Sequence, residues 1–124
     1  MSEVMVGPGR QRRILIAEDE TIIRLDLREL LQHAGFEVCG EARDGEEAVQ
    51  LALATRPDLA LLDVKMPRLD GIEAARRILD ELPIPVLILT AYTDEALVRR
   101  AVEAGVFGYL AKPFREQEIG RAHV

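Results

Sequence analysis

The stretch Ile14-Leu15-Ile16-Ala17-Glu18-Asp19 is a run of four apolar residues that ends on two carboxylates. The same arrangement recurs at 59–63 (Leu-Ala-Leu-Leu-Asp), 86–90 (Val-Leu-Ile-Leu-Thr) and 108–112 (Gly-Tyr-Leu-Ala-Lys). Short apolar runs without polar alternation are typical of strands that are covered on both faces. If these runs are neighbouring parallel strands, their polar groups meet at the carboxyl edge of the sheet, where open α/β folds bind ligands.

Segments with apolar residues at helical spacing separate the runs. They cover residues 21–33, 46–55, 72–82 and 94–104, and a further strand is predicted at 36–40. Strand and helix therefore alternate along the chain, which predicts an α/β domain with a parallel sheet and helices on both faces.

The two ends of the chain carry weaker patterns. Residues 1–12 contain Gly and Pro without periodicity, and we expect a flexible N-terminal lead before a domain that spans 13–124. A fifth helix is expected after Phe114, but residues 115–124 supply only two or three turns and include Gly120. We therefore expect that helix to be short or truncated.

Composition limits the function classes. The net charge of −6 argues against direct nucleic-acid binding by the domain, since phosphate backbones attract a surplus of Lys and Arg. No apolar stretch approaches the length of a membrane helix, and the single cysteine, Cys39, is compatible with a reducing compartment. We expect a cytoplasmic protein in which Cys39 is an ordinary packed thiol.

The carboxylates at the predicted strand ends suggest a metal site. Glu18, Asp19 and Glu20 alone would be read as a solvated turn before a helix. Asp63 changes that interpretation, because a charge at the end of an apolar strand is costly unless it is paired or coordinated. Crowded carboxylates call for a cation, and Mg²⁺ prefers oxygen ligands. No cluster of His or Cys offers a zinc site, since His33 and His123 are isolated in the sequence.

Lys112 and Thr90 supply groups of the opposite kind. Lys112 is either a surface lysine on a loop or a fixed cation that pairs with Asp63 at rest and with an anion afterwards. Thr90 is either a strand-end hydroxyl or a donor to that anion, and the small Ala91 beside it leaves the pocket open. Pro113 restricts the backbone of Lys112 and so limits how the lysine is presented.

Several of these motifs together resemble the receiver domain of bacterial two-component response regulators. The resemblance covers residues 13–116 and rests on Glu18-Asp19, Asp63, Met66-Pro67, Asp70-Gly71, Thr90-Ala91 and Lys112-Pro113. The runs 63–68 and 89–92 are most similar to receivers of ANTAR-type antiterminator regulators, which carry an RNA-binding output module. The resemblance implies a flavodoxin-like, doubly wound, five-stranded parallel sheet of order 2-1-3-4-5.

The resemblance also implies a role for each acidic position. Asp63 is expected to be the phosphoacceptor that takes a phosphoryl group from a phosphohistidine. Asp19, Asp63 and the backbone carbonyl of Lys65 are expected to bind Mg²⁺, with Glu18 reaching the metal through water. Glu18 stands where the family more often has aspartate, and the side chain of Lys65 is either a solvated loop lysine or a group that alters the lifetime of the phosphoryl group.

The remaining matches imply phosphoryl binding and a switch. Thr90, Ala91 and Lys112 are expected to hold the phosphoryl group. Thr90 and Tyr109 are expected to move together and to change the surface of the fourth helix and fifth strand. The implied partners are a sensor histidine kinase or phosphotransfer protein and a C-terminal output domain absent from this chain, while homodimer formation is left open.

Three other interpretations compete. A flavodoxin-like redox protein needs a phosphate-binding loop after the first strand, where this chain has three acids instead. A Mg²⁺-dependent phosphatase with an aspartyl nucleophile usually has a second acid where this chain has Lys65. A receiver-like interaction module that is never phosphorylated is disfavoured by the complete set of Asp19, Asp63, Thr90 and Lys112.

Overall fold

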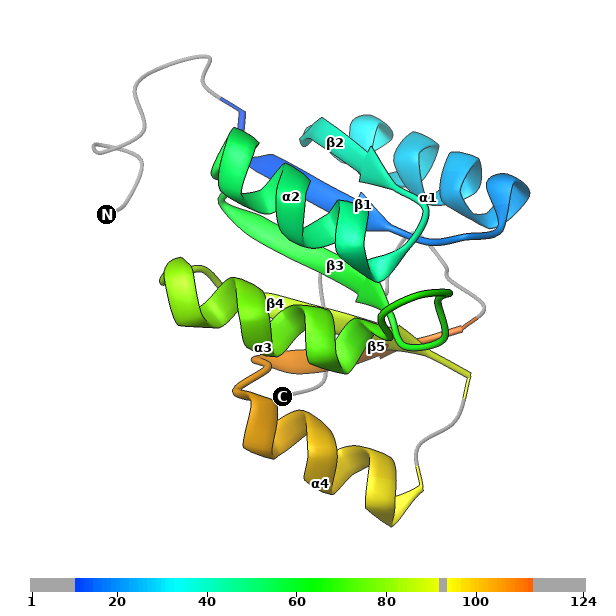
Figure 1. Ribbon diagram of the computed structural model, residues 1–124. Helices are drawn as coiled ribbons and strands as arrows, with labels where there is room; N and C mark the ends of the chain where they lie inside the picture. The colour runs from blue at the N-terminus through cyan, green and yellow to red at the C-terminus, as the bar shows by residue number, and fades with distance from the viewer. Residues whose placement is uncertain (1–10, 92–93, 113–124) are drawn as a thin grey trace, which may run out of the picture.

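The computed structural model describes residues 11–91 and 94–112 as alternating strands and helices (Figure 1). Their order is β1 (Arg13–Ala17), α1 (Thr21–His33), β2 (Glu37–Ala42), α2 (Gly45–Thr55), β3 (Leu59–Asp63), α3 (Gly71–Glu81), β4 (Val86–Thr90), α4 (Glu95–Ala104) and β5 (Gly108–Ala111). The predicted fifth helix, Pro113, and the N-terminal lead up to residue 10 lie outside the described residues.

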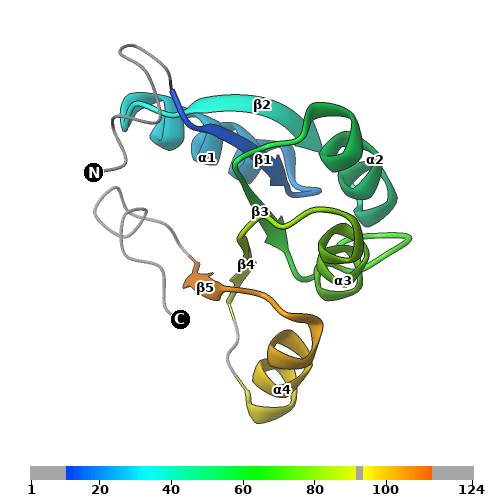
Figure 2. The ribbon, with the colours of Figure 1, turned by 90° about the vertical axis from the view of Figure 1, so that its left-hand side faces the viewer.

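All five strands are parallel and follow the order β2-β1-β3-β4-β5, as predicted. Helix α1 lies on one face of the sheet, and α2 and α3 lie on the other, with α4 near β5 (Figure 2). The reversal of strand order between β1 and β3 places the carboxyl ends of these two strands side by side, which is the usual ligand site of such sheets.

The burial of β1 explains why its sequence does not alternate. Leu15 and Ala17 pack in the core under α2 and α3, whereas Ile14 and Ile16 pack in the core under α1. All four side chains are buried, because helices cover both faces of the central strands.

Several predicted starts shift by one residue, as at α2 and α3, which begin at Gly45 and Gly71 rather than at 46 and 72, and two predicted ends were also wrong. Strand β2 runs from Glu37 to Ala42 rather than over 36–40, because it pairs with β1 as far as Ala17 and Ala42. Helix α3 ends at Glu81, one residue before Leu82, which is extended and buries its side chain in the core. In both places tertiary pairing or packing, rather than the local pattern, sets the end of the element.

Aspartates cap the N-termini of three helices. The side chains of Asp44, Asp70 and Asp94 accept hydrogen bonds from backbone N–H groups three residues later, at 2.8, 2.9 and 2.8 Å. Such caps satisfy donors that the first helical turn leaves unpaired. The helix predicted over 94–104 therefore begins at Glu95, with Asp94 as its cap.

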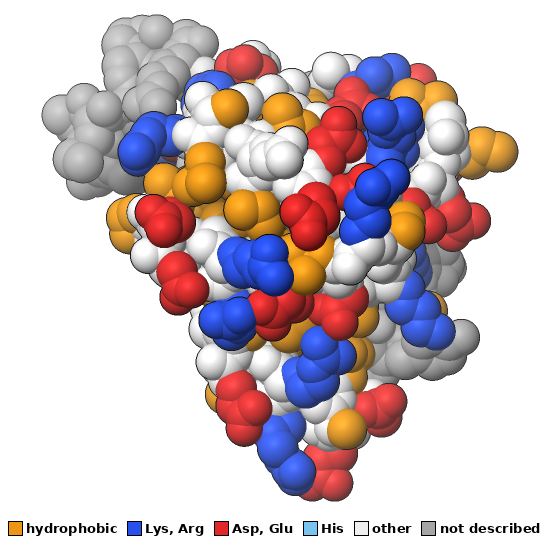
Figure 3. Space-filling model, viewed as in Figure 1, with side chains coloured by type: hydrophobic (Ala, Val, Ile, Leu, Met, Phe, Trp, Pro, Cys, Tyr) orange, Lys and Arg blue, Asp and Glu red, His pale blue; other side chains and the backbone are white. Residues whose placement is uncertain are grey.

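The surface over α2, α3 and α4 carries acidic and basic side chains next to one another (Figure 3). On α3, for example, Arg76 and Arg77 both pair with Glu73. A surface of mixed sign does not provide the continuous basic patch that a nucleic-acid backbone requires. In the part of the chain that the structure describes, no helix has the length and apolar character required to cross a bilayer.

Candidate functional site

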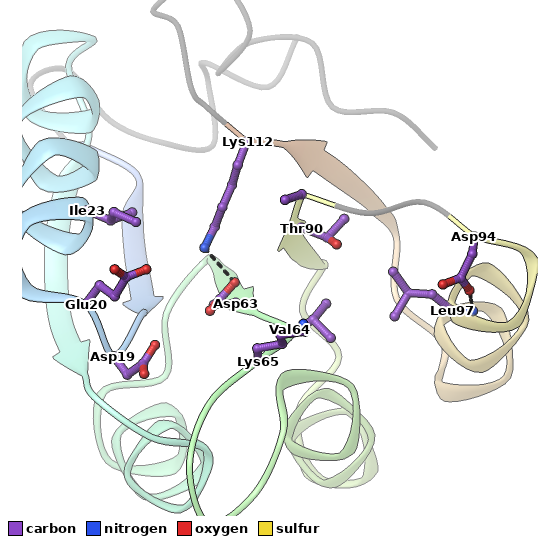
Figure 4. Close-up of a pocket in the computed structure, with 11 residues that line it drawn as sticks. Asp19, Glu20, Ile23, Asp63, Val64, Lys65, Thr90, Asp94, Leu97 and Lys112 are labelled. Carbon is purple, nitrogen blue, oxygen red and sulfur yellow. Dashed lines mark hydrogen bonds and ion pairs between the residues drawn. The ribbon is translucent and has the colours of Figure 1, made fainter.

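A pocket of about 600 Å³ opens at the carboxyl edge of the sheet (Figure 4). It collects side chains from the ends of β1, β3, β4 and β5, as the positions of the polar groups in the sequence predicted. The predicted site residues that line it are Asp19, Asp63, Lys65, Thr90, Ala91 and Lys112.

The end of β1 separates two consecutive acids. Glu18 is fully buried, while Asp19 is exposed and faces the pocket. The backbone N–H of Glu18 donates to the carbonyl of Ala42 at 3.0 Å, which continues the pairing of β1 with β2. The Glu18 carboxylate turns inward and accepts a hydrogen bond from the N–H of Glu20 at 3.1 Å. The acidic triplet is therefore not simply a solvated turn.

Asp63 is the last residue of β3 and is also buried. The chain turns sharply after it, and the N–H of Gly71 donates to the carbonyl of Val64 at 2.9 Å. A Cβ added at Gly71 would lie 1.9 Å from the carbonyl oxygen of Asp63. Only glycine allows the N-terminus of α3 to approach Asp63 this closely, and this steric role of Gly71 was not predicted from the sequence.

Lys112 joins the two buried acids. Its Nζ lies 2.8 Å from Glu18 Oε1 and 2.9 Å from Asp63 Oδ1. Its backbone N–H donates to the carbonyl of Thr90 at 2.9 Å, so the end of β5 is held against the end of β4. The ion pair with Asp63 expected at rest is present, and the interpretation of Lys112 as a surface lysine is wrong. The pairing with Glu18 was not predicted, because nothing in the local sequence relates two residues this far apart.

The charges of the site do not balance. Glu18, Asp19 and Asp63 each offer a carboxylate oxygen within 4.8 Å of the others, with Lys112 as the cation between two of them. Burial raises the pKa of Glu18 and of Asp63, and the hydrogen bonds and charge of Lys112 offset only part of that rise. Burial opposes protonation of Lys112, but its two carboxylate partners raise its pKa overall. A hard divalent cation bound among these oxygens would relieve the repulsion, so the donor set fits Mg²⁺.

Thr90 and Tyr109 connect the pocket to α4. Thr90 is buried at the end of β4. Tyr109 lies on β5, where it pairs in register with Ile88 of β4. Tyr109 packs against a small core that includes Val64 and Ala101. A second cavity of about 210 Å³ is lined by both Thr90 and Tyr109 and by residues of α4. The two predicted switch residues therefore border a common space beside α4.

Comparisons with known proteins indicate the family of the chain. Residues 14–123 match the response regulator receiver domain model. The chain is 54% identical over 108 residues to the transcriptional regulatory protein PdtaR of Mycobacterium tuberculosis, covering 87% of this chain and 53% of that protein. It is 33% identical to the chemotaxis protein CheY of Thermotoga maritima, covering 90% of this chain and 93% of that protein.

Solved structures of receiver domains have a similar fold. The receiver domain of the NarL response regulator from M. tuberculosis superposes with a TM-score of 0.84 at 35% identity, covering 88% of this chain and 90% of that one. Chemotaxis protein CheY4 of Vibrio cholerae has a TM-score of 0.83 at 32% identity, covering 90% and 94%. The chain spans about half of the length of PdtaR. It spans less than a third of a protein-glutamate methylesterase/protein-glutamine glutaminase of Pyrococcus abyssi, to which it is 39% identical.

Proposed function

Because the chain belongs to the family of response regulator receiver domains, we propose that it accepts a phosphoryl group on Asp63 from a phosphohistidine of a partner protein. The observation that carries the proposal is the buried Asp63 carboxylate at the pocket, 2.9 Å from Lys112 and close to two further acids. A lone surface aspartate would have neither the cation nor the metal-binding neighbours.

The acidic residues have two different roles in this proposal. Asp19, Asp63 and the backbone carbonyl of Lys65 would hold Mg²⁺, which supplies charge neutralisation when it is bound. Both carboxylate oxygens of Glu18 already accept hydrogen bonds, one from Lys112 and one from the N–H of Glu20. Glu18 would therefore reach the metal through water, and it also serves as the resting partner of Lys112.

The transfer needs little covalent help from the protein. A carboxylate oxygen of Asp63 forms a bond to phosphorus, and the bond between phosphorus and the donor histidine nitrogen breaks, returning its electron pair to the imidazole. Such reactions depend mainly on in-line positioning and electrostatic stabilisation. Lys112 exchanges part of its contact with Asp63 for a phosphoryl oxygen, and the Thr90 hydroxyl and Ala91 N–H contact the other oxygens.

Phosphorylation then biases the surface formed by α4 and β5. Thr90 moves toward the phosphoryl group, and Tyr109 takes up the space that Thr90 leaves beside α4. Val98, Val102 and Phe107 are the exposed apolar side chains of that surface, with exposed fractions of 43%, 70% and 60%. We propose that an output domain reads this surface, in the manner of an RNA-binding antiterminator regulator. The similarity to half of a transcriptional regulatory protein supports that output.

Intact-mass measurement tests the phosphoacceptor. The protein is incubated with acetyl phosphate and Mg²⁺, and one added phosphoryl group is expected. Asp63→Asn should lose the adduct. Asp94→Asn is the matched control, because Asp94 lines the same pocket and asparagine still caps α4, so its adduct should persist.

The same experiment separates the competing functions. Absence of an adduct on a folded wild-type sample would favour a receiver-like interaction module. Repeated turnover of a phosphate ester, with release of many equivalents of phosphate, would favour an aspartyl phosphatase. A single stable equivalent that requires Asp63 supports the receiver.

A further inference from the structure

We propose that Arg24 of α1 is a positioning residue for the metal-binding acids. It acts on the acidic loop, defined as Glu18–Glu20, and through that loop on Asp19. This inference rests on the proposed function, because it concerns the Mg²⁺ that phosphoryl transfer requires. Arg24 does not line the pocket, so a positioning effect on Asp19 passes through the backbone of the loop.

Arg24 is mostly buried and contacts both the acidic loop and β2. Its Nη1 donates to the backbone carbonyl of Glu18 at 2.8 Å, and its Nε lies 3.4 Å from Glu41 Oε1 on β2. Only 12% of its side chain is exposed. One guanidinium thus connects the N-terminal turn of α1, the acidic loop and the end of the neighbouring strand.

The contact with the Glu18 carbonyl fixes the orientation of one particular peptide group. That carbonyl belongs to the peptide bond between Glu18 and Asp19, which is planar. The preceding N–H of Glu18 is already held by the carbonyl of Ala42 at 3.0 Å. With both backbone groups of Glu18 fixed, the direction in which Asp19 leaves the strand is fixed as well. Asp19 is exposed, so core packing does not orient its side chain.

The direction of the change in Mg²⁺ affinity on removal of Arg24 distinguishes positioning from a simple effect of charge. A guanidinium near the acids repels Mg²⁺, although Glu41 partly neutralises it. If Arg24 acted only through its charge, its removal would tighten Mg²⁺ binding. If it positions the loop, its removal weakens Mg²⁺ binding in spite of the lost positive charge. Groups that orient metal ligands from behind typically contribute 10–100-fold in affinity.

The matched control is Arg28, one helical turn further along α1. Arg28 pairs with the same carboxylate, since its Nη1 lies 2.9 Å from Glu41 Oε2, and it carries the same charge. Its side chain is 40% exposed and donates a hydrogen bond to Glu41. Arg28→Met therefore removes the same charge and a contact to the same partner, while the hydrogen bond from Arg24 to the Glu18 carbonyl remains.

The test is the Mg²⁺ dissociation constant, measured by isothermal titration calorimetry on wild type, Arg24→Met, Arg24→Lys and Arg28→Met. We expect the Arg24→Met constant to rise about tenfold, the low end for such groups. Arg28→Met should stay at the wild-type value or bind more tightly. Arg24→Lys keeps the charge and one donor, so it should recover part of the affinity, and it also serves if Arg24→Met does not fold.

Kinetics provide a second readout. With acetyl phosphate as donor, loss of positioning should raise the Mg²⁺ concentration that gives half the maximal phosphorylation rate. Equal or tighter Mg²⁺ binding by Arg24→Met and Arg24→Lys, relative to Arg28→Met, would overturn the inference. A wild-type protein that binds no Mg²⁺ would instead refute the proposed function, so the two failures are distinguishable.

Discussion

Replacing Lys112 with methionine tests how much the cation of the site contributes to the folded state. The ammonium lies 2.8 and 2.9 Å from the carboxylates of Glu18 and Asp63. Methionine keeps much of the apolar length of lysine but leaves both buried acids without a cation. Removing one partner of a buried ion pair costs about 3–5 kcal/mol. Because the Lys112 side chain is 18% exposed, we expect the lower end, about 3 kcal/mol, near pH 8.

The pH dependence of this loss has a defined sign. Burial already raises the pKa of Glu18 and Asp63, and Lys112 opposes that rise. Without Lys112 both pKa values rise further, so the folded variant retains protons that the unfolded chain has released. Its free energy of unfolding then falls as the pH rises through the raised pKa, by about 1.4 kcal/mol per pH unit for each such proton. The deficit should be small near pH 5 and full near pH 8.

Urea unfolding followed by far-ultraviolet circular dichroism measures the deficit. Mg²⁺ should restore more stability to Lys112→Met than to wild type, because a cation that binds only the folded state replaces the lost charge. Arg99→Met is the control, since Arg99 pairs with Glu95 at 3.9 Å on the exposed face of α4 and should contribute less than about 1 kcal/mol. A loss of equal size at pH 5 and pH 8, or no loss at pH 8, would refute the reasoning.

Three further predictions concern the same edge of the sheet. Gly71→Ala should lower the free energy of unfolding by at least about 1–3 kcal/mol in urea, because its Cβ would meet the Asp63 carbonyl at 1.9 Å; unchanged stability would contradict that contact. Asp70→Ala should cost about 1 kcal/mol by removing the cap on the Glu73 N–H, whereas Asp70→Asn should retain most of it. Burial raises the pKa of Asp70, but hydrogen bonds from the Glu73 N–H and from Arg100 lower it overall. The stability that the Asp70 charge contributes should therefore be lost only as the pH falls through that lowered pKa. If acid unfolding shows that this stability is lost at a higher pH, the reasoning fails. Asp63→Asn removes one of several crowded like charges. At neutral pH without Mg²⁺, its urea midpoint of unfolding should therefore equal or exceed that of wild type. A marked destabilisation would argue against the repulsion among these acids.

The position of the site was predictable because strand direction and strand ends can be read from the sequence. Asp63, Thr90 and Lys112 each follow an apolar run, and parallel neighbours bring such ends to one edge. No tertiary knowledge is needed for that step. The order of the strands came from the resemblance to a family and is confirmed by the sheet.

The internal pairing of the site was not predictable. Three consecutive acids do not reveal which one turns inward, and the structure buries Glu18 while Asp19 and Glu20 stay exposed. The contact of Arg24 with the Glu18 carbonyl depends on where the first turn of α1 lies against β1. In sequence, Arg24 and Arg28 look alike on the same helix, and only packing distinguishes their contacts.

The end of strand β2 could not be predicted from the sequence either. Its residues are mostly half-buried at the edge of the sheet, so its sequence has no strong apolar pattern to mark the end. Pairing with β1 extends it to Ala42 and includes an irregularity opposite Ile14 and Leu15. At Gly40 an added Cβ would lie 3.0 Å from a Leu15 methyl group, which is a tight contact.

Direct identification of the modified residue is the most decisive measurement. The protein is treated with acetyl phosphate in Mg²⁺ or in EDTA, reduced with borohydride to convert an acyl phosphate to an alcohol, digested and sequenced by tandem mass spectrometry. We predict homoserine at position 63, formed only in the presence of Mg²⁺. Reduction product at another carboxylate, or equal yield in EDTA, would contradict a magnesium-dependent phosphoacceptor at Asp63.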